Sequence, residues 1–119
     1  MTINKLCDDA HDYAQGQGFW EADCADERTL VAAKLALIHS EVSEALEAVR
    51  TAGIEPFYID ETGKPEGVLT ELADVVIRVA DLVGYYNDKY SPLAFDFDAI
   101  IAKKMEYNLT RPRRHGKAI

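Results

Sequence analysis

The sequence of 119 residues predicts an all-α fold, a four-helix bundle formed by one domain, residues 1–119. Four segments carry apolar residues at helical spacing, and breaks rich in Gly and Pro separate them. The segment 68–86 is apolar nearly all round, apart from one narrow acidic stripe. A helix of this composition is normally buried. We therefore expect it at the centre of the fold.

The helices are expected at about residues 2–17, 27–52, 67–89 and 95–109. Thr2 and Asp26 are suitable N-caps for the first two helices, because their side-chain oxygens can accept a hydrogen bond from the first turn. Gly53 closes the second helix and Pro112 follows the fourth. Residues 54–67 read as a loop of turns that has room for a short extended pair.

Composition and charge exclude several classes of protein. The net charge of −8 argues against binding to a nucleic-acid polymer, which needs clustered Lys and Arg. No apolar run approaches the length of a membrane span, and the acidic N-terminus does not resemble a signal peptide. Cys7 and Cys24 show neither metal spacing nor a disulfide framework, as in reducing compartments, and Cys7 falls at a core position. We expect a cytoplasmic protein without a membrane partner.

Two acid pairs lie on consecutive helices, and each pair has i, i+3 spacing that places both carboxylates on one side. The pairs are Glu41 with Glu44 and Glu71 with Asp74. Because burial of unpaired carboxylates is costly, a cation is expected between them. Oxygen ligands without His or Cys suit Mg²⁺, with Mn²⁺ as a substitute, and the Glu-x-x-His pairs of di-iron bundles are absent. Such acid pairs also occur on ordinary solvated helices, so the residues alone leave the two readings about equal.

The segments KLALIHSEVSEALEAVR and LTELADVVIRVADLVG resemble the signature of the MazG-like all-α nucleoside triphosphate pyrophosphohydrolases. In that family a Glu-Glu-x-x-Glu motif is followed on the next helix by Glu-x-x-Asp. The ending KMEYNLTRPRRHGK is similar to the family's Lys-x-x-x-Asn-x-x-Arg, and GFW is a weaker likeness. The resemblance covers most of the chain. Ser40 departs from it, because the family has its first Glu there, and the number of bound metal ions stays open.

The resemblance implies Mg²⁺-dependent hydrolysis of a nucleoside or deoxynucleoside triphosphate to the monophosphate and pyrophosphate, a reaction that clears surplus or non-standard nucleotides. It implies that the metal ligands are Glu41, Glu44, Glu71 and Asp74. Glu41 or Glu44 is the candidate general base.

Cations at the C-terminus are the candidates for the pyrophosphate leaving group. Lys104, Asn108 and Arg111 share one face of the last helix, and Lys104 is the candidate catalytic cation. Arg114 and His115 follow in the tail. A basic end that only improves solubility is the alternative.

Other side chains have two readings each. Trp20 with Phe19 either stacks on a base or plugs one end of the bundle. Asp81 either binds a base or sugar or pairs with Arg78, and Lys34 either reaches the acids or a phosphate or extends to solvent. His39 lies on the opposite side of its helix from the acid pair and is not expected to be a ligand.

The apolar back of the helix at 67–89 needs more partners than one bundle supplies, so a homodimer or a tetramer built from dimers is expected. In the resembled family the site lies close to subunit contacts, which would bring the basic tail of one chain to the acids of another. Two alternatives stay open: a non-catalytic helical interaction protein, which Ser40 favours, and a metal-stabilised structural bundle. The sequence indicates neither the preferred base and sugar nor whether diphosphates are substrates.

Overall fold

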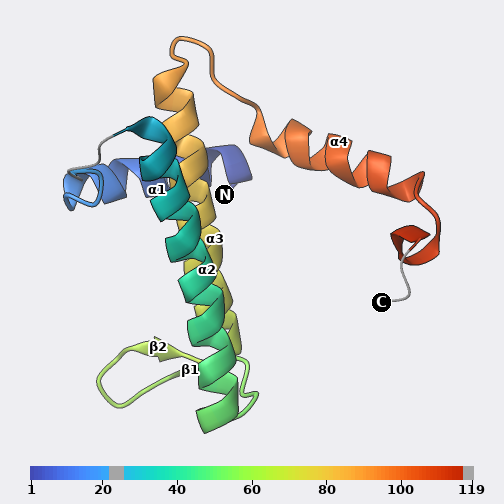
Figure 1. Cartoon of the computed structure of the whole chain (residues 1–119). Coiled ribbons are helices and arrows are strands. Elements are labelled where there is room, and N and C mark those ends of the chain that lie inside the picture. The colour runs from blue at the N-terminus through green and yellow to red at the C-terminus, as the bar shows by residue number, and fades with distance from the viewer. Residues whose placement is uncertain (22–25, 117–119) are drawn as a thin grey trace.

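The computed structural model describes residues 1–21 and 26–116, and these are mostly helical (Figure 1). The helices are α1 (Ile3–Gly16), α2 (Glu27–Ala52), α3 (Val68–Lys89) and α4 (Phe97–Leu109), followed by a 3-10 turn at Arg113–Gly116. The all-α prediction is confirmed, and each predicted helix end lies within two residues of the observed one. Cys24 lies outside the described residues.

Side-chain caps explain where the helices begin. Thr2 Oγ1 accepts a hydrogen bond from Lys5 N at 3.0 Å, and Asp26 Oδ1 accepts one from Thr29 N at 2.7 Å. Both predicted caps are therefore confirmed. Helix α4 starts two residues later than predicted because Asp96 caps it.

A short antiparallel pair joins α2 to α3, as the sequence allowed. Strand β1 (Tyr58–Ile59) pairs with β2 (Pro65–Glu66), and Asp60 Oδ1 holds the turn by accepting from Lys64 N at 3.0 Å. Gly67 then leads into α3 with a φ of 111°, where a Cβ would lie 2.5 Å from the Pro56 carbonyl oxygen. Only glycine fits there without strain.

Helix α2 lies beside α3 in antiparallel orientation, and α1 crosses α3 (Figure 1). The core of this crossing contains the buried residues Cys7, Ala10 and Ala80. The helices approach closely because Gly84 of α3 has no side chain: a Cβ there would lie 2.3 Å from His11 Cβ. Cys7 is fully buried, which raises the pKa of its thiol and confirms its predicted core position.

Helix α4 begins against α1 and then extends away from the α2–α3 pair (Figure 1). Asn4 of α1 fixes its start by accepting from Phe97 N at 2.8 Å, and Phe97 packs on the α1–α3 core. No described residue of α4 is buried, and Met105 and Leu109 are largely exposed. Three helices therefore pack together within one chain, while most of the fourth lies apart.

The expected burial of the central helix holds for its second half alone. Ala80 and Leu82 of α3 are buried, whereas Leu72 and Val76 in the first half are about half exposed, because no described segment covers them. Large apolar side chains are also exposed along α2. Among the described helices, none combines the length and apolar character needed to cross a membrane.

Candidate metal centre and its surroundings

Three of the four predicted acids converge between α2 and α3. One carboxylate oxygen from each of Glu41, Glu71 and Asp74 lies within 4.8 Å of the other two. We call these residues the acid trio. Glu41 comes from the middle of α2 and has a side chain only 12% exposed, while the other two come from the first two turns of α3. Three oxygen donors from two rigid helices are a fitting ligand set for a hard divalent cation.

The fourth acid, Glu44, lies beside the trio on the next turn of α2. A hydrogen bond to Glu41 and the charge of Glu41 raise the pKa of Glu44, and the charge of Glu71 acts in the same direction. The acids are thus close enough to repel one another. A bound divalent cation would remove this repulsion, which is a second reason why the residues fit a metal ion.

A cation from the protein already meets the trio. Arg78, one turn beyond Asp74 on α3, donates from Nε to Glu41 Oε1 at 2.6 Å. The sequence left open a pair between Arg78 and Asp81 of the same helix, but the contact found here crosses to α2. Side-chain pairing across two helices depends on their packing, which periodicity alone does not reveal.

A cavity of about 220 Å³ adjoins these charged groups. Its polar lining includes Glu41, Asp74, Arg78 and Asp81. Its apolar lining comes from α1, the segment after α1, and α3: Ala10, Tyr13, Ala14, Phe19 and Ile77. Small-molecule sites combine apolar walls with a few converging polar groups in this way.

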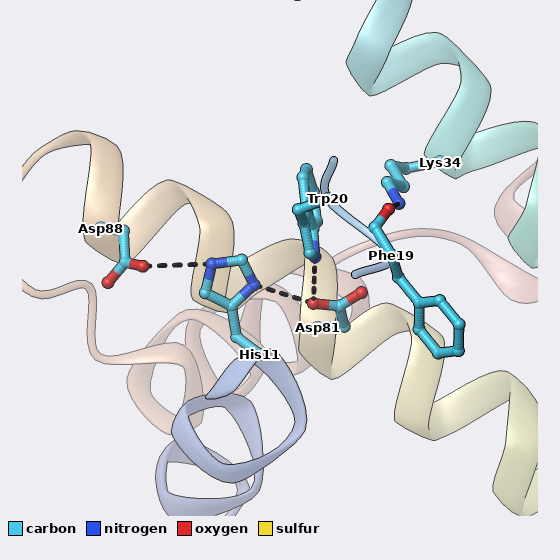
Figure 2. Close-up of polar contacts among 6 residues, drawn as sticks. All are labelled: His11, Phe19, Trp20, Lys34, Asp81 and Asp88. Carbon is cyan, nitrogen blue, oxygen red and sulfur yellow. Dashed lines mark hydrogen bonds and ion pairs between the residues drawn. The ribbon is translucent and has the colours of Figure 1, made fainter. Parts of the chain in front are cut away.

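A buried histidine of α1 and a tryptophan of the segment after α1 both contact Asp81 of α3 (Figure 2). His11 Nδ1 lies 2.8 Å from Asp81 Oδ1, and its Nε2 lies 3.1 Å from Asp88 Oδ2. Trp20 Nε1 donates to the same Asp81 oxygen at 2.8 Å. His11 was not identified from the sequence; its place one turn after Cys7 in the apolar stripe of α1 was the available signal.

Trp20 and Lys34 contact each other in this region. The ring of Tyr85 stacks on Trp20 with centroids 4.9 Å apart, and Lys34 Nζ lies 4.2 Å from the Trp20 ring centroid. Lys34 Nζ also donates to the Phe19 carbonyl oxygen at 2.6 Å (Figure 2). These contacts favour the reading of Trp20 as a plug, and they show Lys34 reaching the segment that follows α1.

The predicted substrate-binding residues on and after α4 lie apart from the acid trio in one chain, because α4 extends away from α2 and α3 (Figure 1). Lys104 Nζ lies 5.0 Å from the Tyr107 ring centroid, and Asn108 and Arg111 are half-buried. Arg114 is exposed, with a φ of 56°. The side chain of His115 lies outside the described residues.

His39 is exposed on α2. Comparisons of the chain with protein-family models, with curated proteins and with solved structures find no match.

Proposed function

We propose that this chain is a Mg²⁺-dependent nucleoside triphosphate pyrophosphohydrolase of the MazG-like type. The observation that carries the proposal is the convergence of Glu41, Glu71 and Asp74 at the α2–α3 contact. In the proposed reaction, the oxygen of a water molecule bonds to the α-phosphorus while the bond from that phosphorus to the α–β bridging oxygen breaks. The products are the nucleoside monophosphate and pyrophosphate, with the water's protons passing to a base and to solvent.

The acid trio would hold the cation. When bound, Mg²⁺ or Mn²⁺ supplies a Lewis acid that polarises phosphate oxygens and makes a ligated water more acidic. Glu44 is the favoured general base of the two candidates, since Glu41 belongs to the trio and is bonded to Arg78. The raised pKa of Glu44 makes its carboxylate a better proton acceptor than an ordinary glutamate.

The assembly is proposed to be a homodimer or a tetramer built from dimers. The first half of α3, part of α2 and most of α4 expose large apolar side chains that include Leu46, Leu72, Val76 and Met105. Surfaces of this kind usually mark a protein contact. A second copy carries apolar helix faces of matching character, and packing them together would complete the bundle that one chain leaves open.

Self-association would also complete the site. Lys104, Asn108 and Arg111 lie on and just after α4, which leaves its own α2–α3 pair (Figure 1). The α4 of a partner chain can instead approach the acid trio. In that position its cations would stabilise the negative charge that develops on the pyrophosphate group.

The test is a panel of common ribo- and deoxynucleoside triphosphates, incubated with and without Mg²⁺. Chromatography separates monophosphate plus pyrophosphate from diphosphate plus phosphate. We expect Mg²⁺-dependent formation of the first pair, and a loss of roughly a hundredfold or more in kcat for Glu71→Gln because one metal ligand becomes neutral. Glu47→Gln is the matched control, since Glu47 is exposed on α2 and pairs only weakly with Arg50 at 3.9 Å; its kcat should match wild type.

Other outcomes would support the alternatives. Nucleotide binding without turnover of any triphosphate would indicate a helical interaction protein. A Tm raised by Mg²⁺ but unaffected by nucleotides would indicate a metal-stabilised structural bundle. Either result would reject the proposed reaction.

A further inference from the structure

Arg78 occupies an unusual position for a positively charged side chain, because it is bonded to one of a group of acids expected to bind a cation. Its Nε lies 2.6 Å from Glu41 Oε1, and this ion pair joins α3 to α2. The Glu41 side chain is only 12% exposed, so its charge needs a partner in the described structure. A divalent cation coordinated by Glu41 would compete with Arg78 for the same oxygen atoms.

The Arg78 side chain retains the means to bind elsewhere. A guanidinium has five N–H donors, and the bond to Glu41 uses the one on Nε. The side chain is 40% exposed and lines the same cavity as Asp74 and Asp81. Its fork of donors matches the oxygen geometry of phosphate better than a lysine would. A phosphate group entering this cavity would therefore meet a suitable ligand on α3.

We propose that Arg78 is an exchangeable counter-ion of the acid trio. It neutralises Glu41 while the trio holds no metal ion, and it transfers to a phosphate oxygen of the substrate once a divalent cation takes Glu41. The second half of this inference rests on the proposed function, whereas the first half concerns metal binding alone. Metal and nucleotide then favour each other's binding, because the phosphate provides the arginine with a new partner.

The first experiment measures Mn²⁺ binding without nucleotide by titration calorimetry. Arg78→Met removes the competing charge and keeps an apolar side chain of similar length, so it should bind Mn²⁺ roughly tenfold more tightly than wild type. Arg50→Met is the matched control, because Arg50 is exposed near the end of α2 and pairs with Glu47; its Mn²⁺ affinity should be that of wild type. Unchanged or weaker binding by Arg78→Met overturns the inference.

The second experiment repeats the titration with a nucleoside triphosphate analogue whose α–β bridging oxygen is replaced by NH. In wild type the analogue should tighten Mn²⁺ binding, and the ratio of the Mn²⁺ Kd without the analogue to the Kd with it gives the coupling factor. In Arg78→Met this factor should be roughly tenfold smaller than in wild type. An equal factor in both proteins would show that Arg78 does not pass to the phosphate. Arg78→Lys should recover only part of the factor, since lysine keeps the charge but loses the fork.

A measurement on the wild-type chain covers the case in which Arg78→Met does not fold. The Nε–H signal of Arg78 in a ¹⁵N NMR spectrum, assigned with Arg78→Lys, should shift when Mg²⁺ is added and shift again with the analogue. A signal that Mg²⁺ leaves unmoved would overturn the inference. A failure of the proposed function alone would give another pattern of results. Mn²⁺ would bind and the Arg78 signal would respond to Mg²⁺, yet no triphosphate would be hydrolysed.

Discussion

At the scale of single residues, Glu27 links the beginning of α2 to the end of α3. Its carboxylate accepts hydrogen bonds from the Tyr85 hydroxyl and the Lys89 ammonium group. These two partners lower the pKa of Glu27 below its ordinary value, with the Lys89 bond as the larger cause. The bonds are with the ionised form, so protonation weakens this contact between the two helices.

The stability of the fold should therefore depend on the ionisation of Glu27. A carboxyl group whose pKa is lowered by folding contributes stability above its unfolded pKa, and this contribution disappears as the pH falls through the folded pKa. We expect Glu27→Gln to lower Tm at pH 7, with the difference from wild type shrinking as the pH falls below the ordinary glutamate pKa of about 4.3 and vanishing below the lowered pKa of the folded protein. Thermal unfolding followed by circular dichroism at a series of pH values measures this.

The matched control is Glu47→Gln, which removes an exposed carboxylate of the same helix that lies 3.9 Å from Arg50. Pairs of this kind contribute little, so its Tm should stay close to wild type across the range. A Tm difference for Glu27→Gln that persists unchanged at low pH would contradict the ionic explanation.

At the scale of elements, the crossing of α1 over α3 depends on Gly84. A Cβ at this position would lie 2.3 Å from His11 Cβ and 2.7 Å from the Cys7 carbonyl oxygen, so alanine would force the two helices apart. We expect Gly84→Ala to lower the free energy of unfolding by about 3 kcal/mol, despite the better helix propensity of alanine. Denaturant unfolding measures the loss.

Gly16→Ala provides the control for this substitution. Gly16 is the last residue of α1, and a Cβ built there meets nothing within 4 Å. Its unfolding free energy should stay within about 1 kcal/mol of wild type. Equal stability of the two variants would mean that α1 can move away from α3 at little cost.

The helix boundaries could be predicted from sequence because they depend on nearby residues. The side chains of Thr2 and Asp26 bond to backbone groups three positions away, which sequence spacing displays directly. Much of the acid trio could also be anticipated, since each acid pair lies on one helix face. The bond between Arg78 and Glu41 could not, because it depends on the rotation of α3 against α2. The place of His11 between two aspartates depends in the same way on how α1 crosses α3.

The direction of α4 was also not predictable from its own sequence. Its exposed apolar residues match a helix packed in a bundle, but the pattern does not say whether the partner surface belongs to the same chain. In the structure α4 leaves the α2–α3 pair (Figure 1). The expectation of burial on all sides of α3 shares this ambiguity, because a helix covered by a second copy has the same composition as one covered by its own chain.

At the scale of the whole molecule, we have proposed that α4 of one chain reaches the acid trio of its partner. This arrangement predicts that two inactive variants can complement each other in a mixed dimer. Glu71→Gln disables the acid trio and Lys104→Ala disables the cation on α4, so each variant alone should be nearly inactive. Equal amounts of the two variants, unfolded and refolded together, should recover about a quarter of wild-type activity. This is expected because half of the dimers are mixed, and one of the two sites in each mixed dimer is intact. Activity that stays at the level of the separate variants would place both residues' roles within one chain.

Light scattering accompanies this experiment and gives the mass of the assembly. A monomer at micromolar concentration would contradict both the exchange of α4 and the proposed covering of the apolar faces. A dimer or tetramer that shows no complementation would keep the assembly and reject the sharing of the site.

The buried thiol at the α1–α3 contact is a built-in chemical probe for opening of that contact. Cys7 has no exposed surface, and burial raises the pKa of its thiol, so in the closed state this thiol is both shielded from an alkylating reagent and poorly ionised. Such a reagent can reach the sulfur only while α1 is separated from α3. Once Cys24 is replaced by serine, the rate of alkylation therefore reports every opening that separates the first helix from α3, whether that helix moves alone or the whole chain unfolds.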